Sequence, residues 1–250
     1  MANNKTNTAP TGKGKHKKEF GEGPIYTITN YILWFLMGNI YFLLLNIPLL
    51  YLLLVLVSNG QNALPQGFAV VFSLCCIPMG PAATALFSVM GKLIREKDVN
   101  ITKDFFKAYK TNFLQSLFFW TLGILIIIIL TYDVRILISY NYPRILVFIL
   151  YVFIAFVFIL GLYIFPIISR FYLKSKDVLK FASYYAIKKI HITILNLFSF
   201  VIVGFVFFKI SSFIALFISS IICFMIMYYE QKILLEIEEK LKIDGDKTNL

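Results

Sequence analysis

Long runs of apolar residues alternate with short polar or charged stretches along this chain. Each run is long enough for a helix that crosses the hydrocarbon core of a bilayer, which takes about 17–25 residues. The pattern therefore predicts an all-α, polytopic membrane protein with six transmembrane helices. The spans are expected at about 31–57, 68–90, 114–132, 145–168, 191–208 and 213–229.

The segments outside the six spans are polar. Residues 1–24 are rich in Asn, Thr, Gly and Lys, which predicts a disordered basic tail in front of a membrane domain at 25–230. Residues 231–250 carry an apolar stripe and i,i+4 pairs of acid and base, so a charged helix and tail are expected there, with the helix ending at Gly245. The expected pairs are Glu236 with Lys240 and Glu238 with Lys242.

The second span is interrupted by prolines. Pro78 and Pro81 remove two backbone donors, so the helix should kink or open there. Gly80, Thr84, Ser88 and Gly91 follow at spacings of four, four and three and form a stripe of small residues on one face. Two interpretations stay open: a contact at which another helix packs closely, and a re-entrant or discontinuous helix that lines a solute path.

The first span contains two side-chain amides inside its apolar run. Asn39 and Asn46 lie seven residues apart and therefore share one helical face, and Pro48 predicts a kink just beyond them. An amide in lipid must find a hydrogen-bond partner, so this face is expected to point at other helices. Contact with a ligand is the alternative interpretation.

Two basic aromatic segments separate apolar runs. Over 101–113, aromatic residues recur every fourth position while lysines occupy the rest of the turn, which predicts an amphipathic helix with Thr102 as its N-cap. Such an elbow helix is expected to lie in the cytoplasmic interface against anionic lipids, and docking a cytosolic partner is the alternative. A second segment of this kind covers 169–190. The candidate docking residues are Lys103, Phe105, Phe106, Lys107, Tyr109 and Lys110.

Composition and charge add orientation to this picture. The chain is 59% hydrophobic and only 15% charged, with a mean hydropathy of +0.79, which excludes an ordinary soluble domain. The net charge of +11 does not indicate nucleic-acid binding, because the cations lie in clusters between the apolar runs. If the six spans alternate, all but three of the 24 Lys and Arg residues fall on one side. Cytoplasmic loops carry the positive excess, so both termini are expected in the cytoplasm. The three exceptions are Arg135, Arg144 and Lys209.

Catalytic chemistry is not expected. Hydrolysis or group transfer needs paired carboxylates, a nucleophile with a histidine, or a metal cluster, and the predicted spans hold no acidic residue near their middle. For the same reason proton-coupled or ion-coupled transport is not expected. His191 is expected to be interfacial, and Cys75, Cys76 and Cys223 lie in apolar runs without ligand spacing. We expect no catalytic residues, no metal site and no cofactor.

Four motifs together resemble the YesL-like family of bacterial membrane proteins, over about residues 20 to 230. They are the segment from Asn39 to Pro48, the pattern Pro78-x-Gly80-Pro81-Ala82-x-x-Ala85-Leu86, the segment from Lys103 to Phe113, and the junction from Phe165-Pro166 to Arg170-Phe171. The resemblance implies a protein of the bacterial plasma membrane with an uncharacterised activity. It also implies a family often found alongside carbohydrate-uptake systems of the ATP-binding-cassette type. It assigns no catalytic or ligand residues.

Two hypotheses for function follow. The first is a non-catalytic accessory or regulatory subunit linked to carbohydrate uptake, with ATP-binding-cassette transporter components as partners. The second is a small-solute facilitator or channel whose path passes the Pro78–Pro81 break, lined by Asn39, Asn46 and Thr84. Neither the solute nor the oligomeric state follows from the sequence.

Overall fold

The computed structural model describes residues 24–59, 67–97, 99–209 and 215–247, and these are helical apart from short turns and connections. Six helical segments there are long and apolar enough to cross a membrane, which confirms the predicted all-α class with six spans. Residues 1–23 of the predicted tail lie outside the described part. The α-helices are α1 (Pro24–Leu45), α2 (Ile47–Asn59), α3 (Phe68–Cys75), α4 (Met79–Glu96), α5 (Ile101–Ser139), α6 (Arg144–Arg170), α7 (Ser175–Lys188), α8 (Ile190–Lys209) and α9 (Ile218–Lys247).

The chain divides between Leu33 and Trp34 into two units. Residues 24–33, the described part of the first unit, form the first turns of α1 and expose apolar side chains such as Ile28 and Ile32. The rest of α1 and all the other helices belong to the second unit.

The predicted first span is two helices rather than one. α1 ends at Leu45 and α2 begins at Ile47, so the membrane-length segment is Thr27–Leu45 and α2 is a shorter apolar helix. The break lies at Asn46, whose backbone N–H donates to the carbonyl of Leu43 (3.0 Å) because Pro48 prevents a regular continuation. The side-chain amide of Asn46 donates to the Phe42 carbonyl at 2.7 Å and thereby satisfies a group that the break would leave free.

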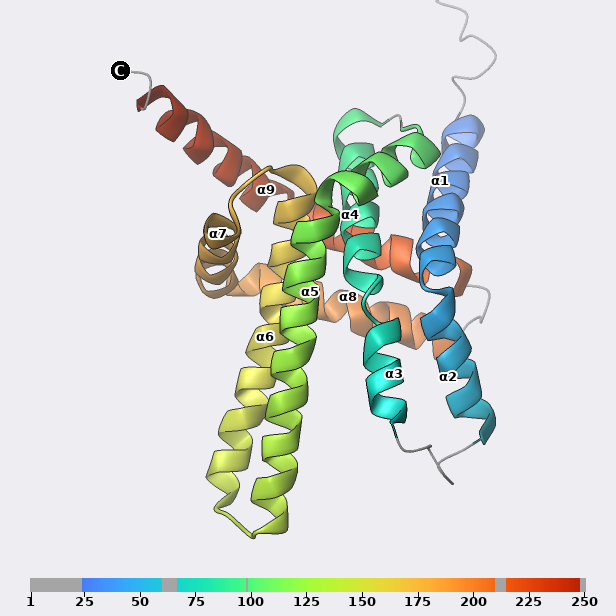
Figure 1. Ribbon diagram of the computed structural model, residues 1–250. Helices are drawn as coiled ribbons and strands as arrows, with labels where there is room; N and C mark the ends of the chain where they lie inside the picture. Colours follow the sequence, from blue (N-terminus) through green and yellow to red (C-terminus); the bar gives the residue numbers. More distant parts are fainter. Residues whose placement is uncertain (1–23, 60–66, 98, 210–214, 248–250) are drawn as a thin grey trace, which may run out of the picture. The chain divides into compact units, whose positions relative to one another are not determined.

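The second span is also broken, as the prolines predicted. α3 ends at Cys75 and α4 begins at Met79, with a turn between them that contains Pro78, and the two helices follow each other end to end (Figure 1). Together they make the segment Val70–Glu96, which is long enough to cross the bilayer. The span is therefore discontinuous, with one turn of irregular backbone inside it.

α4 forms the centre of the packed core. It contacts α5, α6 and α9, and its side chains from Ala82 to Leu93 include several that are wholly buried. Small residues early in α4 let the neighbouring helices approach its backbone closely, as in other membrane proteins. The wholly buried apolar side chains of α4 are Ala82, Ala85, Leu86, Val89, Met90 and Leu93.

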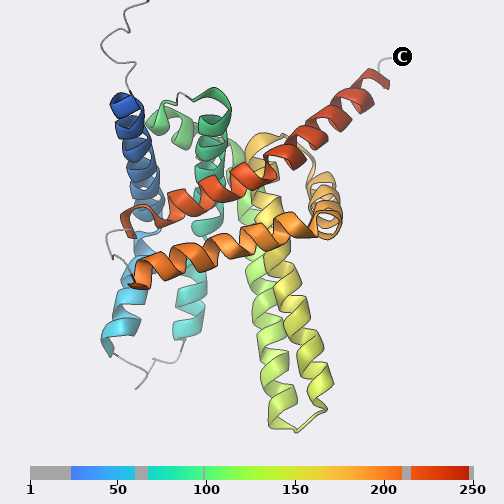
Figure 2. The ribbon, with the colours of Figure 1, turned by 180° about the vertical axis from the view of Figure 1, so that it is seen from behind.

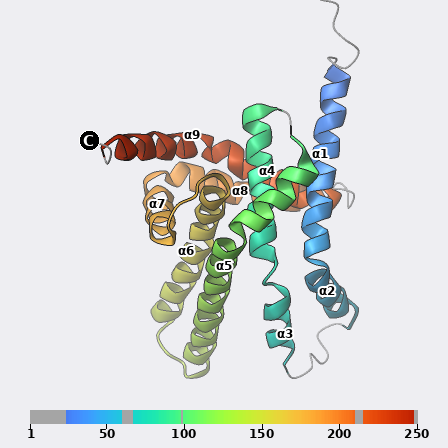
Figure 3. The same cartoon turned by 45° about the horizontal axis from the view of Figure 1, so that its top comes forward.

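α5 and α6 form a long antiparallel hairpin (Figures 1 and 2). α5 joins the predicted elbow 101–113 and the predicted third span in one continuous helix, and its first turns run across α4 before it turns into the hairpin (Figure 3). Its N-cap is Asn100, whose side-chain oxygen accepts from the Lys103 backbone N–H at 3.2 Å, so the prediction of Thr102 was wrong. Farther along the hairpin, side chains such as Ile129 and Phe148 are exposed, as lipid-facing residues would be.

The last two apolar helices lie side by side. α8 and α9 cross α4 and α6 at a steep angle, with α7 near the start of α8 (Figures 1 and 2). α9 joins the predicted sixth span and the predicted C-terminal helix without interruption and continues through Gly245 to Lys247, so the expected stop at Gly245 was wrong. Gly245 lies within α9 and does not adopt the left-handed backbone conformation with which a glycine commonly ends a helix.

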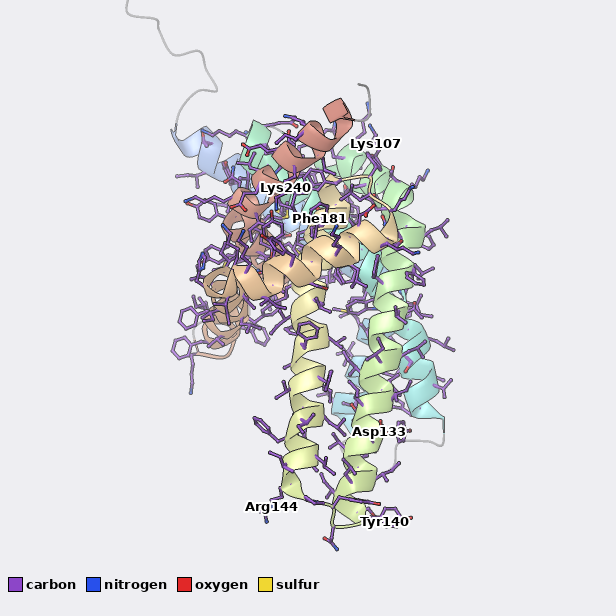
Figure 4. The ribbon with its side chains drawn as sticks, turned by 90° about the vertical axis from the view of Figure 1, so that its left-hand side faces the viewer. Lys107, Asp133, Tyr140, Arg144, Phe181 and Lys240 are labelled. Atoms are coloured by element: carbon purple, nitrogen blue, oxygen red, sulfur yellow. The ribbon has the colours of Figure 1, made fainter. Side chains whose placement is uncertain are left out.

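The basic segments gather at one end of the second unit. Lys107 of α5, Phe181 of α7 and Lys240 of α9 lie toward the same end in Figure 4, whereas Tyr140 and Arg144 lie at the tip of the α5–α6 hairpin. The elbow segments and the described part of the C-terminal segment therefore lie toward one end of the unit.

Candidate functional site

The helix break is closed by a side chain from α5. The indole Nε1–H of Trp120 donates to the carbonyl of Cys76 at 2.7 Å, and the Met79 backbone N–H donates to the same carbonyl at 3.1 Å. A backbone carbonyl exposed inside a membrane is costly unless it finds such partners. Protein groups therefore supply the hydrogen bonds that the Cys76 carbonyl needs at the break.

The small-residue stripe lies in tight helix contacts. A Cβ atom added at Gly80 would overlap the Cβ and Cγ atoms of Trp120, and one added at Gly91 would overlap the end of the Met227 side chain on α9. Thr84 is wholly buried, and its hydroxyl donates to the Gly80 carbonyl of its own helix at 3.1 Å. Gly80 and Gly91 therefore allow close helix packing. The Thr84 hydroxyl has its hydrogen-bond partner within α4, and Ser88 of the same helix is half-buried.

A cavity of about 400 Å³ lies beside the break. Its walls come from α1, α4, α5, α6, α8 and α9 and are almost entirely apolar. The wall residues include Met79, Ala83, Phe87, Trp120, Phe165 and Ile226. Such walls would take a hydrocarbon group and offer almost no partner to a sugar hydroxyl.

The two predicted amides of α1 do different things. Asn39 bridges to the start of α9, where its Nδ2 donates to the Ala215 carbonyl (3.2 Å) and its Oδ1 accepts from the Ser219 backbone N–H (3.1 Å). Asn46 bonds within its own helix, and its Oδ1 has no partner among the described residues. Neither amide lines the cavity beside the break.

The predicted docking segment is anchored on one face. Phe105 is wholly buried and, with Phe106, packs against the Tyr41 ring of α1 in tilted arrangements with centroid distances of 5.6 and 5.3 Å. Asp104 accepts from the ammonium of Lys92 on α4 at 2.8 Å, which holds the start of α5 across the end of α4. The opposite face presents Lys103, Lys107 and Lys110 to the surroundings, and Tyr109 is half-buried between the two faces.

A second surface is formed by residues of α7 and α9, and we call it the α7–α9 platform. It comprises Phe181, Tyr184, Tyr185, Lys188 and Lys240. It is held by two ion pairs, Arg170 with Glu238 and Lys189 with Glu236, each at 2.6 Å. Lys242 also pairs with Glu238 (3.1 Å), as predicted. The predicted pair of Glu236 with Lys240 was wrong, because Glu236 pairs with Lys189. The ammonium of Lys240 instead donates to the hydroxyl of Tyr185 on α7 at 3.1 Å.

The platform contains a basic aromatic hollow of about 470 Å³. Two ammonium groups, those of Lys188 and Lys240, each lie 4.9 Å from the ring centre of Tyr184. The Lys188 ammonium donates to the Tyr184 hydroxyl at 2.6 Å, which holds the pKa of that tyrosine below its usual range and the pKa of the lysine above its own. The residues that line the hollow are Lys180, Phe181, Tyr184, Lys240 and Ile243.

Sequence reasoning missed a buried polar pair on α8 and α9. Asn196 and Glu230 are both wholly buried, and the amide Nδ2 of Asn196 donates to Oε1 of Glu230 at 2.6 Å. Glu230 was expected to lie just beyond the sixth span, but α9 continues past it inside a membrane-length segment. A signal was present, because Glu230 shares the spacing of the buried residues Ile226, Ile233 and Ile237 on one helical face.

The comparisons with known proteins bear on the first half of the chain. Residues 32–134 match the model of a family described as a protein of unknown function, DUF624. The match reaches from α1 into α5 and so includes the broken span and the anchored start of α5. No curated protein and no solved structure matches the chain. The chain is therefore similar to a family of unknown function over its first five helices.

Proposed function

We propose that the protein is a non-catalytic accessory or regulatory subunit of a membrane assembly. The observation that carries this proposal is the contrast between its interior and its basic end. The break at Pro78–Pro81 is closed by Trp120, and the cavity beside it is apolar. Exposed lysines and aromatic groups, by contrast, gather on the start of α5 and on the α7–α9 platform.

The proposed docking surface is the exposed lysine face of α5 together with the α7–α9 platform. We place it in the cytoplasm, with both termini, because cytoplasmic segments carry the excess of Lys and Arg. The resemblance to YesL-like proteins supports the bacterial plasma membrane as the location. It also supports transporter components of the ATP-binding-cassette type for carbohydrate uptake as the partner.

The facilitator hypothesis finds less support. A sugar that entered the apolar cavity would exchange its hydrogen bonds with water for almost none with protein. Two of the expected path residues, Asn39 and Thr84, already have protein partners. An accessory role requires no such path.

Affinity purification under mild detergent tests the proposal. A tagged full-length chain should recover transporter components. The triple variant K103Q/K107Q/K110Q should recover several-fold less at an equal yield of the chain, because a charged face supplies orientation and attraction during encounter. The matched control is R135Q/R144Q, which removes exposed cations at the far end of the hairpin and should recover as much as the wild type.

Two results would contradict the accessory role. Repeated recovery of the chain alone is one. Solute flux in liposomes that contain only this protein is the other, and it would favour the facilitator.

A further inference from the structure

The inference concerns the buried pair Asn196 and Glu230, and it is independent of the proposed function. Both side chains are 0% exposed, yet each keeps one oxygen without a partner among the described residues. These atoms are Oδ1 of Asn196 and Oε2 of Glu230. Both would be acceptors if the carboxyl group were ionised.

The surroundings do not offer a counter-ion. A buried carboxylate with a single neutral hydrogen bond is strongly disfavoured unless a cation or a proton joins it. Within the described residues, three cations on or beside the helices packed on α9 pair with other acids, and Arg144, Lys209 and Lys232 are exposed. Lys92 of α4 pairs with Asp104 and Glu96, Arg170 of α6 pairs with Glu238, and Lys189 before α8 pairs with Glu236.

The remaining titratable groups nearby do not neutralise Glu230 either. Arg95 of α4 lies in the field of Arg170, Glu96 and Glu238. His191, near the start of α8, is exposed. The hydroxyl of Tyr163 on α6 is within electrostatic range of Glu230, but it is uncharged and hydrogen-bonded to Thr193 at 2.7 Å.

A single proton would satisfy both unpaired oxygens. A protonated Oε2 becomes a donor, and Oδ1 of Asn196 is the vacant acceptor on the amide that already bonds to the same carboxyl group. We propose that Glu230 and Asn196 form a proton-binding site between α8 and α9, in which a neutral carboxyl group and an amide make two reciprocal hydrogen bonds.

A metal cation fits this site less well. Calcium and magnesium take about six or more oxygen ligands, whereas the pair offers two unpaired oxygens. Loss of the proton would leave a charge facing a second acceptor, so α8 and α9 should pack less firmly. The site would then act as a proton-dependent latch between these two helices.

Infrared spectroscopy of the purified full-length protein tests the site. The wild type should show the C=O band of a protonated carboxyl group at neutral pH, and Glu230→Gln should lack it. The matched control is Glu239→Gln, which changes an exposed acid of the same helix and should keep the band. If the wild type and Glu230→Gln have the same carboxyl spectrum, the proposal is wrong.

Thermal unfolding in detergent gives a second readout. Glu230→Gln keeps the shape of the neutral acid and can both accept from Nδ2 of Asn196 and donate to its Oδ1, so it should fold and lie nearest to the wild type at low pH, where the glutamate is protonated in the folded and the unfolded chain alike. In the wild type the melting temperature should fall as the pH rises above the ordinary glutamate pKa of about 4.3, because the unfolded chain then releases a proton that the native site keeps, and this fall should end at the pH where the native site itself loses the proton; Glu230→Gln should lack this part of the fall. Equal pH profiles, or a melting temperature that follows sodium or potassium concentration instead of pH, would overturn the proposal.

Discussion

At the scale of the residue, the break in the second span depends on two side chains that meet only in the folded protein. Gly80 lets α5 approach so closely that the Trp120 side chain lies against the glycine backbone. The same indole donates to the Cys76 carbonyl at 2.7 Å and satisfies the backbone that the prolines disrupt. One aromatic residue therefore provides both the packing and the hydrogen bond at the break.

Substitution of Gly80 tests this arrangement. Gly80→Ala should destabilise the fold by about 1–3 kcal/mol, because the new methyl group would overlap the first atoms of the Trp120 side chain, which cannot swing away. The readout is the midpoint of thermal unfolding in detergent.

Two other glycines provide the comparison. Gly123→Ala on α5 meets no atom within 4 Å and should be neutral or stabilising by up to about 1 kcal/mol, as glycine is a poor helix former. Gly91→Ala should fall between the two, because its neighbour is the flexible end of Met227. Equal midpoints for the Gly80 and Gly123 variants would contradict the close contact.

At the scale of the element, α9 is held by partners on other helices in addition to one ion pair within itself, Lys242 with Glu238. The i,i+4 spacing of Glu236 and Lys240 predicted a pair, but α7 and the start of α8 bring Lys189 and Tyr185 closer. Spacing along a helix shows which residues can meet within it, and a neighbouring helix can supply a better-placed partner.

Removal of the two cross-helix ion pairs should loosen the C-terminal half of α9. Each partly exposed pair is worth about 0.2–1 kcal/mol, so the double variant E236Q/E238Q should speed amide hydrogen exchange over 231–247 by roughly two- to thirtyfold. Exchange in the α5–α6 hairpin should stay unchanged.

The control for this prediction is Glu239→Gln, which alters an exposed acid on the same stretch of α9. It should leave exchange over 231–247 as it is in the wild type. An equal acceleration by both variants would show that helix charge, and not the ion pairs, sets the stability of this segment.

At the scale of the whole molecule, the basic segments gather toward one end of the second unit. Lys107 and Lys240 lie toward one end and Arg144 at the other in Figure 4. The basic segments come from distant parts of the chain and lie toward the same end of the unit, so the charge pattern reports a property of the assembled fold. This grouping is the physical basis for the proposed orientation.

Cysteine labelling on intact cells tests the orientation. In a background with Cys75, Cys76 and Cys223 replaced, a membrane-impermeant maleimide should label Arg144→Cys and should label neither Lys107→Cys nor Lys240→Cys. All three variants should react once the cells are opened. Labelling of Lys107→Cys from outside would reverse the assignment.

The sequence by itself determined the helical class, the six apolar segments, the break at Pro78 and the clustering of Lys and Arg in the segments between apolar runs. These features follow from hydropathy, helix periodicity and missing backbone donors, which are local properties of the chain. The sequence did not determine which predicted segments form one continuous helix. The elbow at 101–113 and the third span are one helix in α5, and the sixth span and the C-terminal helix are one helix in α9. Nothing local stops a helix where an apolar face simply gives way to a charged one.

Only the tertiary structure decided which polar groups meet. Trp120 reaches a carbonyl 44 positions away, and Asn196 reaches Glu230 across 34 positions. An acid at the edge of an apolar run reads as a boundary in the sequence, whereas the packing of α8 on α9 buries it beside an amide. The physical reason is that burial belongs to the assembled helices, and only burial turns an ordinary glutamate into a group that needs a proton.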